Sequence, residues 1–185
     1  MRIIKRYAFV FIGILSFLSG GQHLKAQNYA SSLELSSGIV EDGYGINAGY
    51  NYYLNRFRYI QGAVFLSFAE DNQQGFSVPY NNFTLNIGYF NNIIEALNRK
   101  FTASLGAGPV VGYEIINNGE QELSTGALVN NSSEFLYGGF VGAELDLYLS
   151  ESFSIIGKAN QYYHPSSDLG QFAFFGGIGI RYILF

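Results

Sequence analysis

The chain has 185 residues, of which 48% are hydrophobic, 17% are aromatic and only 13% are charged. Its net charge of −4 argues against the basic surface that nucleic-acid-binding proteins use, and the absence of cysteine excludes a disulfide framework. The 15 Tyr and 17 Phe would make a soluble protein with so few charges prone to aggregate. In a bilayer the same aromatic residues would form interfacial girdles.

Residues 1–26 have the pattern of a secretory signal peptide. Arg2, Lys5 and Arg6 form a basic start, residues 8–20 are apolar, and the small residue Ala26 precedes a plausible cleavage point. An uncleaved membrane anchor is the alternative. Removal of residues 1–26 leaves a single domain over residues 27–185, with 6 basic and 14 acidic residues.

The rest of the chain alternates between two kinds of residue with a period of two, which is typical of β-strands. In residues 43–54, for example, one face carries large apolar residues and the other carries Gly and Asn. A soluble barrel would place its apolar face inside, whereas a membrane barrel turns that face toward lipid. Because the second face is small and polar, the pattern favours a membrane barrel.

The pattern predicts an all-β fold: an eight-stranded antiparallel up-and-down transmembrane β-barrel of outer-membrane type. The strands are expected at 32–40, 43–54, 57–69, 82–90, 100–114, 134–149, 153–163 and 171–185. The connections 55–56, 91–99 and 150–152 would be periplasmic, and 70–81, 115–133 and 164–170 would be outer loops. Strand 57–69 alternates poorly, and residues 91–99 are compatible with a helical turn. The last strand is expected to pair with the first, which removes both free edges.

Six charged residues fall on the predicted inward face: Glu34, Glu114, Glu144, Asp146, Lys158 and Arg181. A symmetric turn at residues 150–152 would place Glu144 opposite Lys158. Unpaired buried charges are costly, so we expect salt bridges that stabilise the interior. A proton or ion path is the alternative, although eight strands leave an interior that side chains fill.

Two kinds of candidate site lie in the predicted outer loops. His164, Ser166 and a nearby carboxylate could form a hydrolase site, but these are also ordinary turn residues, so no catalytic residue is assigned. The loops are candidate partner-binding surfaces through Phe76, Tyr80, Asn117, Glu120, Glu122 and Asn130. The sequence has no nucleotide fingerprint and no zinc-ligand spacing, so no cofactor or metal is expected.

Residues 112–156 carry a distinctive set of residues: Gly112, Tyr113, Glu114, Asn117, Gly126, Phe135, Tyr137, Gly138, Gly139, Glu144, Tyr148 and Leu149. Together with the ending from Gly170 through GGIGIRYI, this set resembles the TraO family of conjugal transfer proteins from Bacteroidota-type conjugative transposons. The resemblance implies an outer-membrane or envelope component of a DNA-transfer apparatus, with no family active site to carry over.

The sequence and the resemblance together predict a protein of the outer membrane of a Gram-negative bacterium. Its expected partners are outer-membrane lipid and other conjugal-transfer envelope proteins, without direct contact to nucleic acid. A lipid-modifying barrel enzyme and a general surface or adhesion barrel are the alternative functions.

Overall fold

The computed structural model describes residues 31–73, 76–97, 100–116, 133–167 and 170–184, and these residues form an all-β structure. The strands are β1 (Ser31–Val40), β2 (Gly43–Asn55), β3 (Arg58–Gln73), β4 (Phe76–Ala96), β5 (Phe101–Ile116), β6 (Glu134–Tyr148), β7 (Phe153–Tyr163) and β8 (Phe172–Leu184). The predicted signal peptide lies outside the described residues. Among the described residues, no helix is long and apolar enough to span a bilayer.

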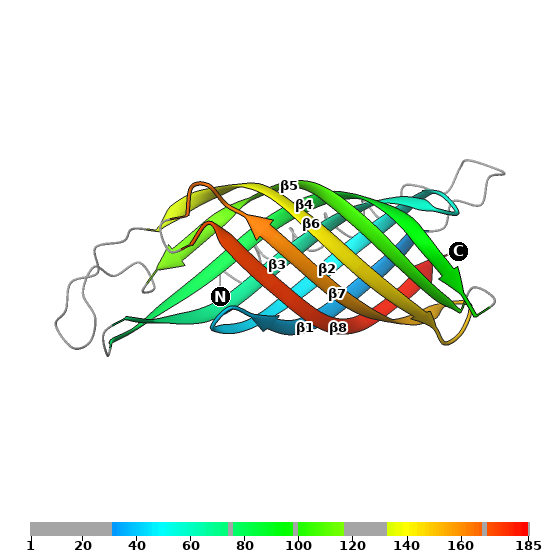
Figure 1. Ribbon diagram of the computed structural model, residues 1–185, viewed down its shortest axis with the longest axis horizontal. Helices are drawn as coiled ribbons and strands as arrows, with labels where there is room; N and C mark the ends of the chain where they lie inside the picture. Colours follow the sequence, from blue (N-terminus) through cyan, green and yellow to red (C-terminus); the bar gives the residue numbers. More distant parts are fainter. Residues whose placement is uncertain (1–30, 74–75, 98–99, 117–132, 168–169, 185) are drawn as a thin grey trace, which may run out of the picture.

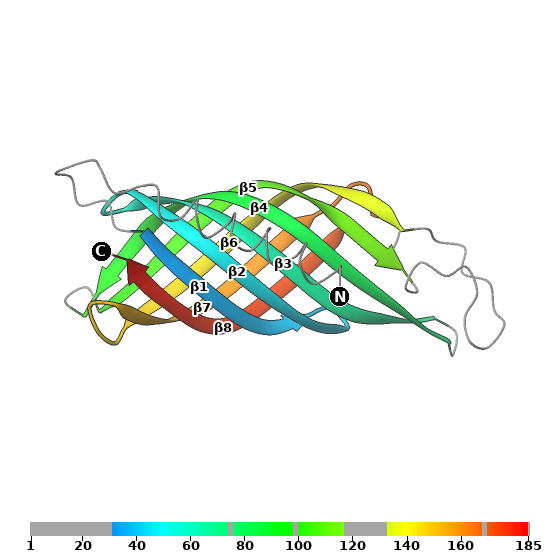
Figure 2. The ribbon, with the colours of Figure 1, turned by 180° about the vertical axis from the view of Figure 1, so that it is seen from behind.

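The eight strands close into one barrel in which each strand pairs antiparallel with the next (Figure 1). β1 also pairs with β8, from Ser31 opposite Leu184 to Val40 opposite Phe175. The two strands lie side by side in Figure 2. The predicted closed eight-stranded barrel is therefore confirmed, and the last strand leaves no open edge because it pairs with the first.

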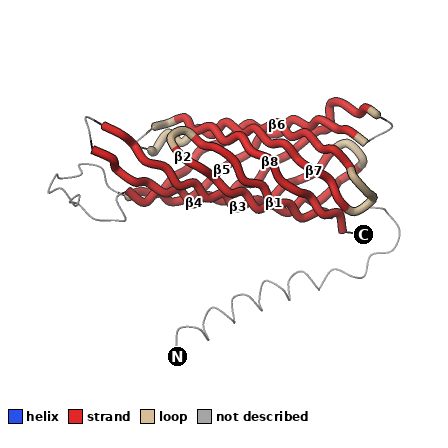
Figure 3. The backbone as a smooth tube through the Cα atoms, turned by 90° about the horizontal axis from the view of Figure 1, so that it is seen from below, coloured by secondary structure: helices blue, strands red, loops and turns tan. Residues whose placement is uncertain are grey.

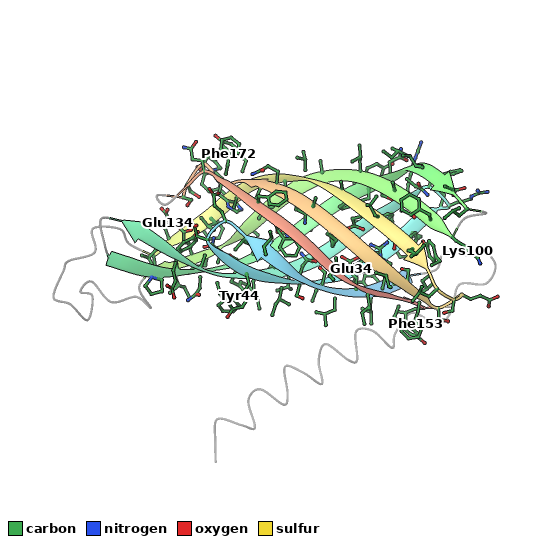
Figure 4. All side chains as sticks on the ribbon, turned by 60° about the horizontal axis from the view of Figure 1, so that its bottom comes forward. Glu34, Tyr44, Lys100, Glu134, Phe153 and Phe172 are labelled. Atoms are coloured by element: carbon green, nitrogen blue, oxygen red, sulfur yellow. The ribbon has the colours of Figure 1, made fainter. Side chains whose placement is uncertain are left out.

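The barrel has two unlike ends. We call one the turn end, where β2 joins β3, β4 joins β5 and β6 joins β7, and where β1 begins and β8 finishes. We call the other the loop end, where β1 joins β2, β3 joins β4, β5 joins β6 and β7 joins β8. Figure 4 shows Lys100 and Phe153 at the turn end and Glu134 and Phe172 at the loop end.

Large apolar side chains cover the outer surface of the barrel. Figure 3 shows that strands make up most of the described chain. The burial of side chains alternates along the strands, so every second residue faces outward. Ile87 and Val141, for example, are each 60% exposed. The exposed set includes Leu33, Leu35, Ile39, Ile46, Leu85, Val111, Tyr137, Leu145, Ile155, Ile178 and Ile180. A surface of this kind is stable in contact with lipid chains, not with water.

The interior contains an aromatic cluster that the alternation did not predict. Its members are Tyr59, Phe65, Phe90, Phe140, Tyr162 and Phe175, each at most 5% exposed. The rings stack in succession: Tyr59 lies 5.1 Å from Phe90 and Phe65 lies 5.2 Å from Tyr162, measured between ring centroids. Strand 57–69 alternates poorly because Tyr59 and Phe65 point inward while Ile60 points outward.

The prediction of an outer loop at residues 70–81 is wrong, because most of this segment belongs to β3 and β4. β3 and β4 continue to pair beyond the barrel wall, from Ala69 opposite Tyr80 to Gln73 opposite Phe76. The polar composition of this segment indicated a loop, but a paired ribbon outside the bilayer has no need of an apolar face. Pro79 is tolerated because the pairing of β4 with β5 begins only at Tyr80.

The connection predicted at 91–99 is also wrong over most of its length. β4 continues to Ala96, with a register irregularity between Asn92 and Ile94. Because a bulge inserts an extra residue, Ile93 and Ile94 both face outward, at 52% and 50% exposure. This break in the alternation produced the apparent helical pattern.

Candidate functional site

A network of buried charges crosses the barrel interior on the side nearer the turn end. It contains the carboxylates of Glu34 (β1), Glu144 and Asp146 (β6) and the cations of Lys158 (β7) and Arg181 (β8), none more than 5% exposed. Glu144 lies opposite Lys158 in the β6–β7 pairing, the position expected from a symmetric turn. Lys158 Nζ lies 2.9 Å from Glu144 Oε1 and also contacts Glu34.

Arg181 is the centre of this network. Its Nη2 atom donates to Glu34 Oε2 at 2.6 Å and its Nη1 atom donates to Asp146 Oδ2 at 2.7 Å. Nη2 also donates to Glu144, and Nε donates to Glu34. The guanidinium also lies 5.6 Å from the centre of the Tyr59 ring. One rigid fork thus ties β8 to both β1 and β6.

Neutral side chains satisfy the remaining lone pairs of the carboxylates. Asn51 Nδ2 donates to Glu34 at 2.9 Å, and Gln61 Nε2 donates to Glu144 at 2.8 Å. Tyr59 donates its hydroxyl to Glu144 at 2.7 Å, and Ser154 donates to Asp146 at 3.1 Å. Sequence reasoning did not single out these residues, although Asn51 falls on the predicted inward face of its strand.

The network is arranged to brace the barrel. Three carboxylates face two cations, and each of the five groups has several partners of opposite charge or neutral polarity. Buried charges are stable only when they are paired and hydrogen-bonded in this way. The network and the aromatic cluster are both buried in the interior, and the space of about 30 Å³ beside Asp146 and Arg181 is small.

Glu114 lies apart from the other five predicted interior charges, near the loop end. It is 1% exposed, and Ser167 Oγ donates to its carboxylate at 3.2 Å. The Asn82 amide, oriented to donate, lies 3.0 Å from Glu114 Oε1. The inward face of the barrel therefore holds two polar centres instead of the single set that the sequence suggested.

The side chains of His164 and Ser166 contact different residues and do not form a pair in this structure. His164 is 3% exposed and stacks on Tyr162, with ring centroids 5.8 Å apart. Ser166 Oγ instead accepts a hydrogen bond from the backbone N–H of Tyr137 at 3.3 Å. The serine next to the buried carboxylate is Ser167, which sequence reasoning did not select. In the described part of the chain, no group of three or more His, Asp or Glu residues is arranged to hold a metal ion.

Of the predicted partner-binding residues, Phe76 and Tyr80 belong to β4 and not to a loop. Tyr80 donates its hydroxyl to the backbone carbonyl of Glu41 at 3.4 Å, which links the β3–β4 ribbon to the β1–β2 turn. The side chain of Phe76 lies outside the described part. Asn117, Glu120, Glu122 and Asn130 also lie outside the described residues.

The turn end presents a different surface from the loop end. Arg56 pairs with Glu95, and this bond raises the pKa of the exposed guanidinium. At the same end of the barrel, Phe57, Leu97 and Leu149 are 46%, 70% and 64% exposed, and the Arg56 guanidinium lies over the Phe57 ring. Leu97 adopts a φ of 53°, a left-handed conformation that is unfavourable for leucine.

The sequence of this barrel also identifies the protein family to which the chain is related. The sequence matches the family described as conjugative transposon protein TraO over residues 18–184, nearly the whole chain. The chain belongs to the TraO family. None of the curated proteins compared matches this sequence.

Solved structures similar to this TraO-family chain are outer-membrane barrels. A major outer membrane protein from Thermus thermophilus matches with a TM-score of 0.61 and 11% identity, over 85% of this chain and all of that one. The N-terminal β-barrel domain of OprF from Pseudomonas aeruginosa matches with a TM-score of 0.58 and 11% identity, over 86% of this chain and 100% of that one. Ail, the attachment invasion locus protein of Yersinia pestis, matches with a TM-score of 0.55 and 15% identity, over 85% and 100%. At these identities the likeness shows the fold: the TraO-family barrel is of outer-membrane type.

Proposed function

We propose that this TraO-family protein is an outer-membrane component of a conjugative DNA-transfer apparatus, with a structural or partner-binding role and no catalytic activity. The family match over residues 18–184 carries this proposal. The apolar outer surface of the barrel supports a location in the outer membrane of a Gram-negative bacterium, with lipid as its neighbour. Residues 1–26 would act as the signal peptide for export.

The turn end would face the periplasm and contact other transfer proteins there. Two observations support this surface: the exposure of the apolar side chains of Phe57, Leu97 and Leu149 at this end, and the left-handed backbone of Leu97. Asn or Gly would suit that backbone better. Residues in strained backbone conformations are common at sites where a protein has a function to perform.

A deletion strain tests the proposal through its transfer frequency. Loss of the gene should abolish or reduce transfer without loss of viability, and the wild-type gene should restore it. Leu97→Asn should leave the barrel folded, because Asn tolerates positive φ, but should reduce transfer. Phe135→Asn is the matched control, since Phe135 is 59% exposed at the loop end. Cells that carry Phe135→Asn should transfer DNA at the wild-type frequency.

The possible outcomes separate the two parts of the proposal. Unchanged transfer after deletion would contradict a role in conjugation and would favour a general surface or adhesion barrel. Normal transfer with Leu97→Asn would contradict only the turn-end contact. A difference in lipid A mass spectra between deletion and wild-type strains would instead favour a lipid-modifying enzyme.

A further inference from the structure

The mouth of the barrel at the loop end contains a cavity of about 530 Å³. This volume lies within the range of small-molecule sites, and residues of five strands or their connections surround it. Its polar lining comes from Glu41, Asp42, Ser67, Tyr80, Asn82, Thr84, Glu114, His164, Ser167 and Gln171. The cavity is separate from the charge network near the turn end.

The lining of the cavity carries negative charge only. Glu41, Asp42 and Glu114 contribute carboxylates, and no Lys or Arg is among the lining residues. The described strand ends and turns extend this asymmetry over the loop end. Six of the 11 acidic residues that the structure describes lie there: Glu41, Asp42, Glu70, Asp71, Glu114 and Glu134.

The cations of the described residues all lie elsewhere. Lys158 and Arg181 belong to the buried network, and Arg56, Arg58 and Lys100 lie in or beside connections of the turn end. A cleft lined by charges of one sign concentrates ligands of the opposite sign. The cavity is therefore suited to a cation.

His164 provides an independent sign that the cavity has a ligand. The side chain lines the cavity and is 3% exposed, yet its Nε2 atom has no hydrogen-bond partner among the described residues. Buried polar atoms of folded proteins are nearly always satisfied. Burial lowers the pKa of His164, so the neutral imidazole adds no positive charge and has one nitrogen able to accept a hydrogen bond.

We propose that this cavity binds a protonated primary amine, with the ammonium group held by the carboxylate of Glu114 and by Nε2 of His164. Ser167 and Asn82 fix the orientation of Glu114, and an ammonium group has three donors for the acceptors around it. The ring of Tyr80 adds an aromatic surface of the kind that attracts cations. The amine is either a free small molecule or a lysine side chain. This proposal does not depend on the role in transfer.

The test uses the full-length protein, purified in detergent micelles, and measures binding by calorimetry at constant ionic strength. Putrescine should bind, whereas 1,4-butanediol, which has the same chain length without charge, should not. Glu114→Gln should weaken putrescine binding by about tenfold or more, because it removes a charge-assisted hydrogen bond. Glu134→Gln is the matched control, since Glu134 lies opposite Glu114 in the β5–β6 pairing but does not line the cavity. It should change binding by less than about twofold.

A second variant and a second probe complete the experiment. His164→Phe keeps a ring against Tyr162 and removes the acceptor, so it should also weaken putrescine binding even if Glu114→Gln does not fold. N-acetyl-lysine amide that binds more tightly than putrescine would identify a lysine side chain as the source, and the reverse order would identify a free amine. Absence of binding by both amines would overturn the proposal. Equal losses of putrescine affinity in Glu114→Gln and Glu134→Gln would also overturn the proposal. Equal inhibition of putrescine binding by MgCl₂ and NaCl at the same ionic strength would overturn it as well. Either result would mean that putrescine responds only to the general negative potential of this end.

Discussion

Arg181 and Glu34 lie directly opposite each other across the seam where β8 meets β1. Arg181 donates to Glu34 Oε2 twice, from Nε at 3.2 Å and from Nη2 at 2.6 Å. The two residues are 147 positions apart in the chain, so this bond forms only when the first and last strands meet. The interior network is therefore coupled to closure of the barrel.

Loss of Arg181 should destabilise the closed barrel strongly. In Arg181→Met, the carboxylates of Glu34, Glu144 and Asp146 would have Lys158 as their only cation in the network. Removal of one partner from a buried ionic cluster typically costs about 3–5 kcal/mol. The midpoint of urea unfolding in detergent micelles measures this loss. Arg181→Lys, which keeps the charge without the planar fork, should have an intermediate midpoint, and a wild-type midpoint for Arg181→Met would contradict the bracing role.

The pair of Glu144 and Lys158 should show strong coupling in a double-mutant cycle. Lys158→Met alone would leave three carboxylates against Arg181, whereas the added change Glu144→Gln would remove one of those charges. The double variant should therefore be less destabilised than the sum of the single variants, by about 0.5–3 kcal/mol. Free energies of unfolding for the four proteins test this coupling. Additive effects would mean that the 2.9 Å contact contributes no net coupling.

Gly38 is required for close approach at the seam. A Cβ atom at this position would lie 2.1 Å from the backbone carbonyl oxygen of Gly176 on β8, a distance that forces the strands apart. Gly38→Ala should therefore lower the free energy of unfolding by about 1–3 kcal/mol and slow closure. Gly62→Ala is the control, because no atom lies within 4 Å of a Cβ there. Equal folding yields in lipid vesicles for both variants would contradict this account of the seam.

His164 should make the stability of the barrel depend on pH. Burial lowers the pKa of His164 from its ordinary value of 6.5, so the unfolded chain binds a proton more readily than the folded barrel. Stability should therefore fall as the pH drops from 6.5 toward the folded pKa. His164→Gln cannot titrate and should show a smaller fall. Both proteins retain Glu114 and the other carboxylates, so the difference between their unfolding curves isolates His164, and identical pH dependence would contradict its burial.

The sequence was sufficient to predict which side chains face outward and much of the register in which neighbouring strands pair. The alternation of apolar and small polar residues follows directly from the period of a strand, so β7 is found at the predicted residues 153–163. The opposition of Glu144 and Lys158 also follows, because a turn of known length sets the pairing of a hairpin.

The description of the inward face as small and polar missed the aromatic rings that lie on it. Phe65, Phe90 and Phe140 occupy the same face as glycines, and only the three-dimensional packing shows that Phe90 fills the space beside Gly106. The ends of β3 and β4 were also misjudged, since pairing outside the bilayer requires no apolar residues. The cavity remained hidden because Glu114, His164 and Ser167 come from segments that meet only in the closed barrel.

The central claim is that this TraO-family barrel works as part of the transfer apparatus in the outer membrane. The most direct measurement is a pull-down of the tagged protein from detergent-solubilised envelopes of cells that carry the whole transfer region. An unrelated tagged eight-stranded barrel serves as the control. The account predicts that other transfer proteins co-purify with the wild-type protein, less with Leu97→Asn, and not with the control barrel. Recovery of the folded barrel without any transfer protein would contradict it.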